Sequence, residues 1–413
     1  LNTPGSVGVN VASLPIDNID KIELLRGGRS AQYGADAVGG VILISTKTER
    51  ETLKTSNYGV RVSYGSFNRQ IYNATHSYNK NKVNTFLSLQ RDLWDGNFNY
   101  LDYYDNEKTM ANNEQSSYNL FFKAGYQFDP EKNLSLSTNW YTADNGTPGM
   151  IENPTPNARL RFDNISYNAT YDQLNLFRDF SLKTQGYYLD YQTKFDDPDA
   201  FGGETHSVHD NFALGLELQQ SGSLGKHLNL SYGYSFRNDR IESTDVGEKE
   251  RNTHSAHSSL TGTLPLNGFI SQLESSVAIR YDAPTDFESA LSPRFSLSAS
   301  HSGSISLTLV SHITKSYKAP SFNDLYWPRD AFAVGNPDLV PEDGFNYDIG
   351  LTTGIKSLSL SANYFRNEIE NLILWAQDAT LNNLWTPKNI SKTSTQGVET
   401  SATLELFDNK YVI

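Results

Sequence analysis

The sequence predicts an all-β membrane protein, an antiparallel transmembrane β-barrel that follows the C-terminal part of a small α/β domain. Three observations favour this fold class. Apolar and polar residues alternate with a period of two over most of the chain, short and long connections alternate between the resulting strands, and the chain contains 24 Tyr, 21 Phe and 5 Trp. We expect the small domain in residues 1–50 and the barrel in residues 51–413.

The segment 16–47 has the composition of a compact α/β unit. A short amphipathic run at 19–25 leads into a glycine-rich stretch, where small residues let two backbones approach closely. The apolar run 41–44 then predicts a strand that is buried on both faces.

The order of residues in this segment resembles the last part of the plug domain of TonB-dependent outer-membrane receptors. The resemblance rests on the patterns I-x-x-I-x-x-I-E-x-L-R-G, S-A-x-Y-G and A-x-G-G-V-I-x-I-x-T-K. It implies a plug motif formed by Glu23, Arg26, Gly27, Tyr33, Gly34, Gly39 and Gly40.

Beyond residue 50 the alternation of apolar and polar residues predicts strands with one apolar and one polar face. A clear example is 228–236, in which Leu, Tyr and Phe alternate with Asn, Ser and Gly. Soluble β-sandwiches also alternate, so the connections decide. Short turns on one side and long loops on the other are typical of an outer-membrane barrel.

We count roughly sixteen to seventeen strands, whereas large plugged transporters close at about 22. The sequence therefore predicts a barrel that is incomplete at its C-terminal end and open there. A solvent-exposed meander of hairpins is the simpler alternative.

Two distant segments extend the resemblance. Residues 313–342, with ITKSYKAPSFNDLYWP and GNPDLVPE, and residues 389–406, with the triplet G-V-E, are similar to the cobalamin and siderophore branches of the family. The resemblance implies energy-coupled import across the outer membrane of a Gram-negative bacterium. It also implies three partners: the TonB complex of the inner membrane, whose binding box lies upstream of Leu1, the lipid and lipopolysaccharide of the outer membrane, and a small-molecule metal complex as substrate.

Composition excludes several other classes. A mean hydropathy of −0.53 and no apolar run near about 18 residues argue against a helical membrane bundle. A net charge of −13 argues against nucleic acid as a partner, because that affinity comes from clustered Lys and Arg. The chain has no Cys and no nucleophile elbow, phosphate loop or HExxH pattern, so we expect no enzyme and no covalently bound cofactor.

An acidic segment near residues 92–114 is a candidate calcium site. Asp95, Asp102 and Asp105 supply carboxylates of the kind that Ca²⁺ prefers, and the resemblance to cobalamin receptors implies calcium-ordered loops. The alternative is a solvated acidic loop without a metal ion.

A second candidate site contains Tyr326, Trp327, Asp330 and Phe332 in the longest expected loop. Aromatic rings offer large contact areas at small entropic cost, so these residues suit a planar ligand. The alternative is a membrane-interface aromatic or a loop packed on itself.

The expected cargo is a cobalamin-like corrinoid, with a ferric siderophore as the second choice. No His lies between Ser321 and Gly335, which disfavours axial ligation of haem by this loop. Acidic loops suit a neutral or cationic complex better than an anionic catecholate. A soluble or surface carbohydrate-binding β-protein and a passive porin are the alternatives from other classes.

Overall fold

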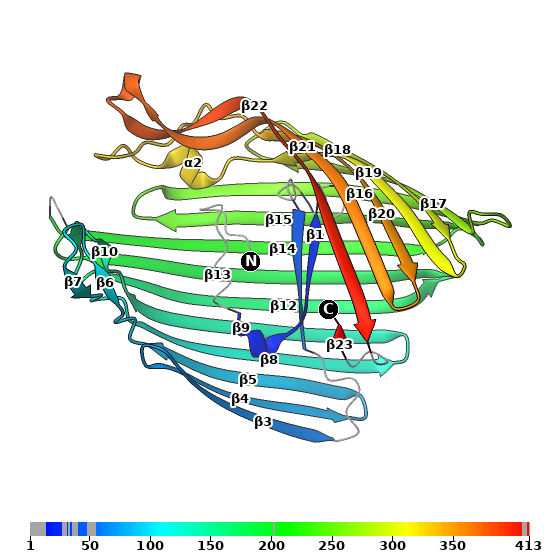
Figure 1. The fold of residues 1–413 in the computed structure, drawn as a ribbon, viewed down its shortest axis with the longest axis horizontal. Coiled ribbons are helices and arrows are strands. Elements are labelled where there is room, and N and C mark those ends of the chain that lie inside the picture. The colour runs from blue at the N-terminus through cyan, green and yellow to red at the C-terminus, as the bar shows by residue number, and fades with distance from the viewer. Residues whose placement is uncertain are drawn as a thin grey trace.

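The computed structural model describes residues 14–26, 31, 34, 40–47, 55–200, 203–406 and 411–412. Most of these residues lie in antiparallel strands that form one large curved sheet (Figure 1). Among the described residues, no helix has the length and apolar character needed to cross a bilayer.

Within the described residues the barrel has seventeen strands, and all but the two at the junction of β23 with β3 lie between strands that precede and follow them in the barrel's chain order. Their bounds are β3 (Ser56–Gly65), β4 (Arg69–Lys80), β5 (Val83–Trp94), β8 (Gln115–Asp129), β9 (Lys132–Gly146), β12 (Arg159–Phe177), β13 (Phe180–Asp197), β14 (Thr205–Ser223), β15 (Leu228–Ser243), β16 (Gly247–Pro265), β17 (Gln272–Pro284), β18 (Ala290–His301), β19 (Ile305–Lys318), β20 (Glu342–Ile355), β21 (Leu358–Asp378), β22 (Leu384–Leu406) and β23 (Tyr411–Val412). The predicted antiparallel barrel is thereby confirmed.

The strand order is cyclic, with β23 between β22 and β3, which is the order of a closed barrel. This differs from the open edge that we expected from the sequence. The junction is short, because β23 pairs with β22 through only Glu405 to Val412 and Leu406 to Tyr411. A strand of two residues carries no alternation pattern, so its role at the junction could not be read from sequence.

The two faces of the sheet differ as the alternation predicted. In β14, Leu214, Leu216 and Leu218 are 50%, 42% and 39% exposed, whereas Ala213 on the other face is 1% exposed. Ala213 packs with Leu189 on the inner side of the wall. The exposed apolar row therefore forms the lipid-facing side of a transmembrane barrel.

The connections differ by side. One end of the barrel has the turns 81–82, 130–131, 178–179, 224–227, 266–271, 302–304 and 356–357. The opposite end has the connections 66–68, 95–114, 147–158, 198–204, 244–246, 285–289, 319–341 and 379–383. Two of these contain short hairpins: β6 (Asn99–Leu101) with β7 (Glu107–Thr109), and β10 (Gly149–Met150) with β11 (Asn153–Pro154). The longest connections, 95–114 and 319–341, lie on this second side, as expected, but 66–68 and 244–246 are shorter than 266–271 on the first side, so loop length separates by side only in part.

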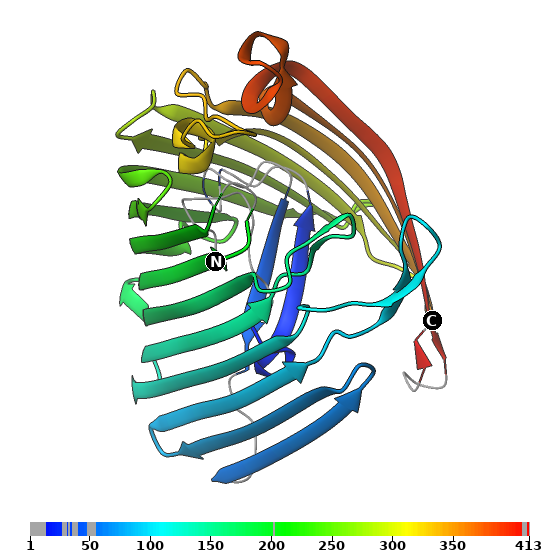
Figure 2. The same ribbon diagram turned by 90° about the vertical axis from the view of Figure 1, so that its left-hand side faces the viewer.

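The described part of the N-terminal unit is a hairpin inside the curve of the sheet (Figure 2). After a short turn, η2 (Ile16–Asn18), strand β1 (Ile19–Arg26) pairs with β2 (Gly40–Thr46). The amphipathic run 19–25 is therefore a strand. Asp17 forms an ion pair of 2.5 Å with Arg61 of β3, and Lys123 of β8 donates to Thr46 at 3.4 Å. Arg61 thus faces the lumen, as predicted.

The assignment of faces can be tested with arginine substitutions in β14 of the full-length protein. Leu216→Arg places a charge on the lipid-facing side near the middle of the strand, so we expect the free energy of unfolding in lipid bilayers to fall by about 2–4 kcal/mol. Gln219→Arg is the matched control, because Gln219 faces the lumen and bonds to Ser231. Equal losses for the two variants in denaturant titrations would contradict the assignment.

Candidate functional site

The connection 319–341 between β19 and β20 is the longest on the long-loop side. It contains α2 (Phe322–Tyr326), which lies over the inner wall of the barrel (Figures 1 and 2). Phe322 is 2% exposed and packs on Ile241 and Val246, with Trp327 at the edge of this cluster. The apolar contact fixes the loop against strands that are distant in sequence.

A capping box starts α2. The Ser321 hydroxyl accepts from the Asp324 backbone N–H at 3.2 Å, and the Asp324 carboxylate accepts from the Ser321 backbone N–H at 3.0 Å. These bonds satisfy backbone donors at the start of the helix. The other carboxylate oxygen of Asp324 accepts from Trp375 Nε1 at 2.8 Å, which joins α2 to β21.

Arg251 of β16 fastens the same loop to the barrel. Its guanidinium bonds to both carboxylate oxygens of Asp286 at 2.8 Å and donates to the Pro320 carbonyl at 3.0 Å. The guanidinium carbon also lies 5.1 Å from the centre of the Phe322 ring. A planar guanidinium suits this combination of bidentate pairing and stacking.

Asp330 organises the tip of the loop. Its Oδ1 accepts from the backbone N–H groups of Phe332 and Ala333 at 2.6 and 2.7 Å, and its Oδ2 accepts from Trp327 Nε1 at 3.0 Å. Partial burial raises the pKa of this carboxyl, but the three hydrogen bonds outweigh it and lower the pKa below its ordinary value. Asp330 is therefore ionised at neutral pH.

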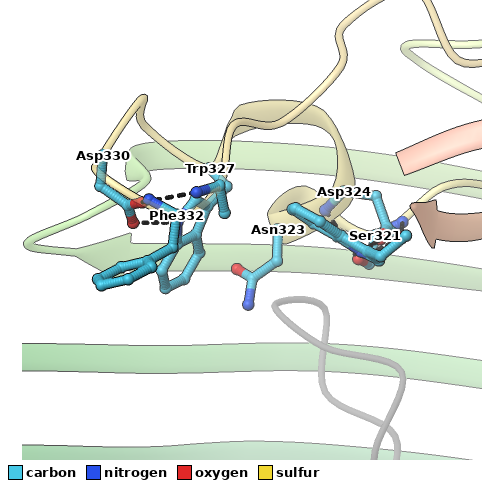
Figure 3. A pocket seen from close by; sticks show the side chains of 8 residues that line it. Ser321, Asn323, Asp324, Trp327, Asp330 and Phe332 are labelled. Atoms are coloured by element: carbon cyan, nitrogen blue, oxygen red, sulfur yellow. Dashed lines mark hydrogen bonds between the residues drawn. The ribbon is translucent and has the colours of Figure 1, made fainter. Parts of the chain in front are cut away.

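These elements enclose a pocket of about 440 Å³ (Figure 3). Its apolar wall includes three aromatic rings, and its polar groups are hydroxyl, amide and carboxylate. The lining residues are Ser321, Asn323, Asp324, Trp327, Asp330, Phe332, Ala333 and Trp375. A concave site with aromatic walls and few polar groups is the usual form of a small-molecule site.

The structure brings together three of the four ligand-binding residues that the sequence suggested: Trp327, Asp330 and Phe332. Tyr326 lies outside the lining, with its ring 6.4 Å from the Phe322 ring and 4.6 Å from Lys249 Nζ. Sequence reasoning missed Trp375, which is distant in the chain. It also missed the S-x-x-D pattern of residues 321–324, a signal of helix capping that was present.

The acidic loop has a different arrangement from the expected calcium site. The Asp102 carboxylate forms an ion pair of 2.9 Å with Lys108 and accepts from the backbone N–H groups of Tyr104 and Asn106. Hydrogen bonding from Lys108, then from these backbone groups, lowers the pKa of Asp102. Asp95 accepts from Asn68 instead.

In the described part of the chain, no three His, Cys, Asp or Glu side chains converge as metal ligands. Calcium binding by this loop stays a prediction from the sequence.

The plug motif is partly described. Glu23 forms an ion pair of 2.8 Å with Lys21, and Arg26 pairs with Gly40 at the end of the β1–β2 hairpin. Gly34 has φ of +97°, a conformation that favours glycine, and a Cβ there would lie 3.7 Å from Arg280 Nη2 of β17. The remaining motif residues, Gly27, Tyr33 and Gly39, lie outside the described residues.

Comparisons with known proteins agree with this architecture. Residues 28–412 match the family model described as "TonB dependent receptor-like, beta-barrel", and residues 1–41 match the "TonB-dependent Receptor Plug Domain". The vitamin B12 transporters BtuB of Photobacterium profundum and Vibrio vulnificus strain YJ016 are each 24% identical, over 95% and 98% of this chain. The chain spans 61% and 63% of their lengths.

Solved structures show the same fold. The copper transporter OprC superposes with a TM-score of 0.75 at 16% identity, covering 94% of this chain and 64% of that chain. The siderophore receptor PirA from Pseudomonas aeruginosa gives a TM-score of 0.72 at 18% identity, covering 96% and 71%.

A lumen-facing hairpin, a barrel with long loops on one side and a pocket in those loops define a plugged barrel receptor. The chain belongs to the TonB-dependent receptor family. This membership favours the receptor class over the two alternatives from other classes, the carbohydrate-binding β-protein and the passive porin.

The capping box gives a test of how the pocket is held. Ser321→Ala removes the hydroxyl that caps α2, so we expect the loop to lose about 0.5–2 kcal/mol of local stability. Hydrogen exchange of the backbone amides at 322–327 should become faster. Ser321→Thr keeps a capping hydroxyl and should exchange like the wild type; unchanged exchange in Ser321→Ala would show that the cap does not order the loop.

Proposed function

We propose that this protein is an outer-membrane receptor that imports a cobalamin-like corrinoid by TonB-coupled movement of its plug. Family membership supports the receptor class. The B12 transporters among the curated relatives, which are 24% identical over about 400 residues, support the choice of cargo. The location in a Gram-negative outer membrane and the partners TonB, lipid and lipopolysaccharide belong to the same proposal.

The observation that carries the cargo assignment is the chemistry of the loop pocket. Trp327, Phe332 and Trp375 supply aromatic walls, Asp324 and Asp330 supply carboxylates, and the lining includes no Lys or Arg. A multiply anionic catecholate complex would need basic side chains to offset its charge. A large neutral or cationic complex with an apolar face meets no such penalty here.

A ferric siderophore is the second candidate cargo. PirA is described as a siderophore receptor and PfeA as a ferric enterobactin receptor, and both have this fold. The fold alone does not separate the two cargoes, because their identities to this chain are 18% and 16%. The lack of basic lining residues in the pocket favours the corrinoid.

Haem is a weaker candidate, even though one relative is named a heme/hemopexin utilization protein, from Haemophilus influenzae, at 23% identity. The structure brings His209 of β14 to 6.4 Å from the Trp327 ring. Both of its ring nitrogens are engaged, Nδ1 with Ser243 at 2.8 Å and Nε2 with Asp245 at 3.3 Å. An axial ligand needs a free nitrogen.

The proposal is tested by equilibrium binding of cyanocobalamin to the full-length receptor in detergent. We expect Trp327→Ala and Phe332→Ala each to raise Kd at least about fivefold, because aromatic rings that become buried against a ligand contribute more than about 1 kcal/mol. Tyr326→Ala is the matched control, since this ring lies in the same loop but outside the pocket lining, and its Kd should stay near the wild-type value.

The same assay includes a ferric catecholate siderophore and a calcium chelator. Tight siderophore binding without cobalamin binding would reject the corrinoid. A loss of cobalamin binding on chelation would support the calcium-ordered loop, and binding indifferent to chelation would reject it.

A further inference from the structure

The inner wall of the barrel carries a row of neutral side chains at one level. Strand registers pair Asn73 with Gln90, Gln90 with Asn119, Asn119 with Tyr141, Tyr141 with Asn164, and Asn164 with Tyr191. The row crosses β4, β5, β8, β9, β12 and β13 without interruption. We call these six residues the neutral panel.

Burial shows that the neutral panel faces the lumen. Asn73, Asn119, Tyr141, Asn164 and Tyr191 are all 9% exposed or less. The residues next to them in sequence point the other way: Tyr118 is 51% exposed, Trp140 is 39% exposed and Leu89 is 46% exposed. The row two residues further along, from Ser88 through Phe121, Asn139 and Ser166 to Leu189, is neutral as well.

Two acceptors of the panel have no hydrogen-bond partner among the described residues. They are Oε1 of Gln90 and Oδ1 of Asn164, both shielded from bulk solvent. Buried acceptors are almost always satisfied by protein, ordered water or ligand. An amide carbonyl in this position accepts from an N–H or O–H group that enters the lumen.

The inner wall formed by β15 to β18 differs from the neutral panel, because it carries charged side chains. Arg280 donates to Asp282 at 2.8 Å and to Ser235 at 3.2 Å, and the Arg294 guanidinium bonds to Ser296 at 3.3 Å and contacts His312 at 3.0 Å. Charged groups are paired along this side, which also approaches Gly34 of the plug. The lumen therefore has a charged side and a neutral side.

Two polar contacts of the described N-terminal residues with the neutral side lie at the margins of the panel. Asp17 pairs with Arg61, which neighbours Asn73 on the β3 side, and Thr46 accepts from Lys123, which lies below the Asn119 level on β8. The panel itself presents amide and phenol groups between these two cations. A displaced plug would leave a neutral, hydrogen-bonding wall between fixed charges.

We propose that the neutral panel is a specificity surface for passage through the barrel, suited to an uncharged solute rich in carboxamide or hydroxyl groups. This inference rests on the proposed function, because a corrinoid carries several carboxamide arms. Transit requires interactions that are strong enough to admit the solute and weak enough to release it. Exchangeable hydrogen bonds to neutral amides meet both conditions, whereas a fixed charge holds water tightly or traps an ion.

The test uses isosteric charge substitutions in the full-length receptor. Asn164→Asp and Gln90→Glu change an amide to a carboxylate at nearly constant volume, which removes a donor and adds a charge. We expect TonB-dependent cobalamin uptake into cells to slow by about tenfold in each variant. Cyanocobalamin Kd at the outer face should stay unchanged, because the loop pocket is untouched.

Gln272→Glu is the matched control, since it makes the same change of amide to carboxylate at the turn end of β17, outside the panel, and should import at nearly the wild-type rate. Unchanged uptake in both panel variants, with heat-modifiable barrels and normal surface amounts, would overturn the panel. Leakage of antibiotics through either variant would also overturn it, because it would show that the panel holds the plug in place. If wild-type protein bound no cobalamin, the proposed function would fail instead, so the two failures are distinguishable.

Discussion

The structure depends on one constraint: in the hydrocarbon of a bilayer every backbone N–H and C=O must be satisfied within the protein. A sheet meets this demand only when its edges are paired, and the cyclic order from β3 to β23 does so. The alternation of apolar and polar residues follows from this closure, because one face of each strand contacts lipid and the other lines the lumen. Lumen chemistry and loops are the parts that remain free to specialise.

Specialisation is greatest in the connection 319–341. A loop of this length would be mobile if it relied on its own backbone, since ordering each residue costs conformational entropy. Here Phe322 is buried against Ile241, Arg251 bonds to Pro320, and Asn389 exchanges hydrogen bonds with the backbone of Val340 at 2.8 and 2.9 Å. The loop is thus attached to strands on both of its sides, and its pocket is formed before a ligand arrives, which reduces the entropic cost of binding.

Sequence predicted the strands well because alternation is a local signal. The alternation at 228–236 falls in β15 (Leu228–Ser243), whereas the next strand, β16, extends beyond its alternating part to Gly247. That extension carries Glu248 and Glu250 above the apolar zone, where lipid no longer imposes alternation. For the pocket, only some of the residues lie close together in the sequence. The aromatic residues near 327 were visible, but the contribution of Trp375 depends on the path of β21, and the direction of Tyr326 depends on a one-turn helix.

Calcium binding by the acidic loop stays a prediction, but the charge of that loop could not be read from composition alone. Composition detects carboxylates, but it does not show that the neighbouring Lys108 neutralises Asp102. Counting acidic residues overstates the charge that a loop offers when a cation lies a few residues away.

Arg251 also has a consequence for how the receptor matures. Its partners Asp286 and Pro320 follow it in the chain by 35 and 69 residues, and the pocket wall is completed only when Trp375 reaches Asp324. Contacts of such long sequence separation form late, after the intervening strands have paired. The loop pocket therefore exists only in a nearly finished barrel, so a partly assembled chain has no formed pocket that could bind a ligand.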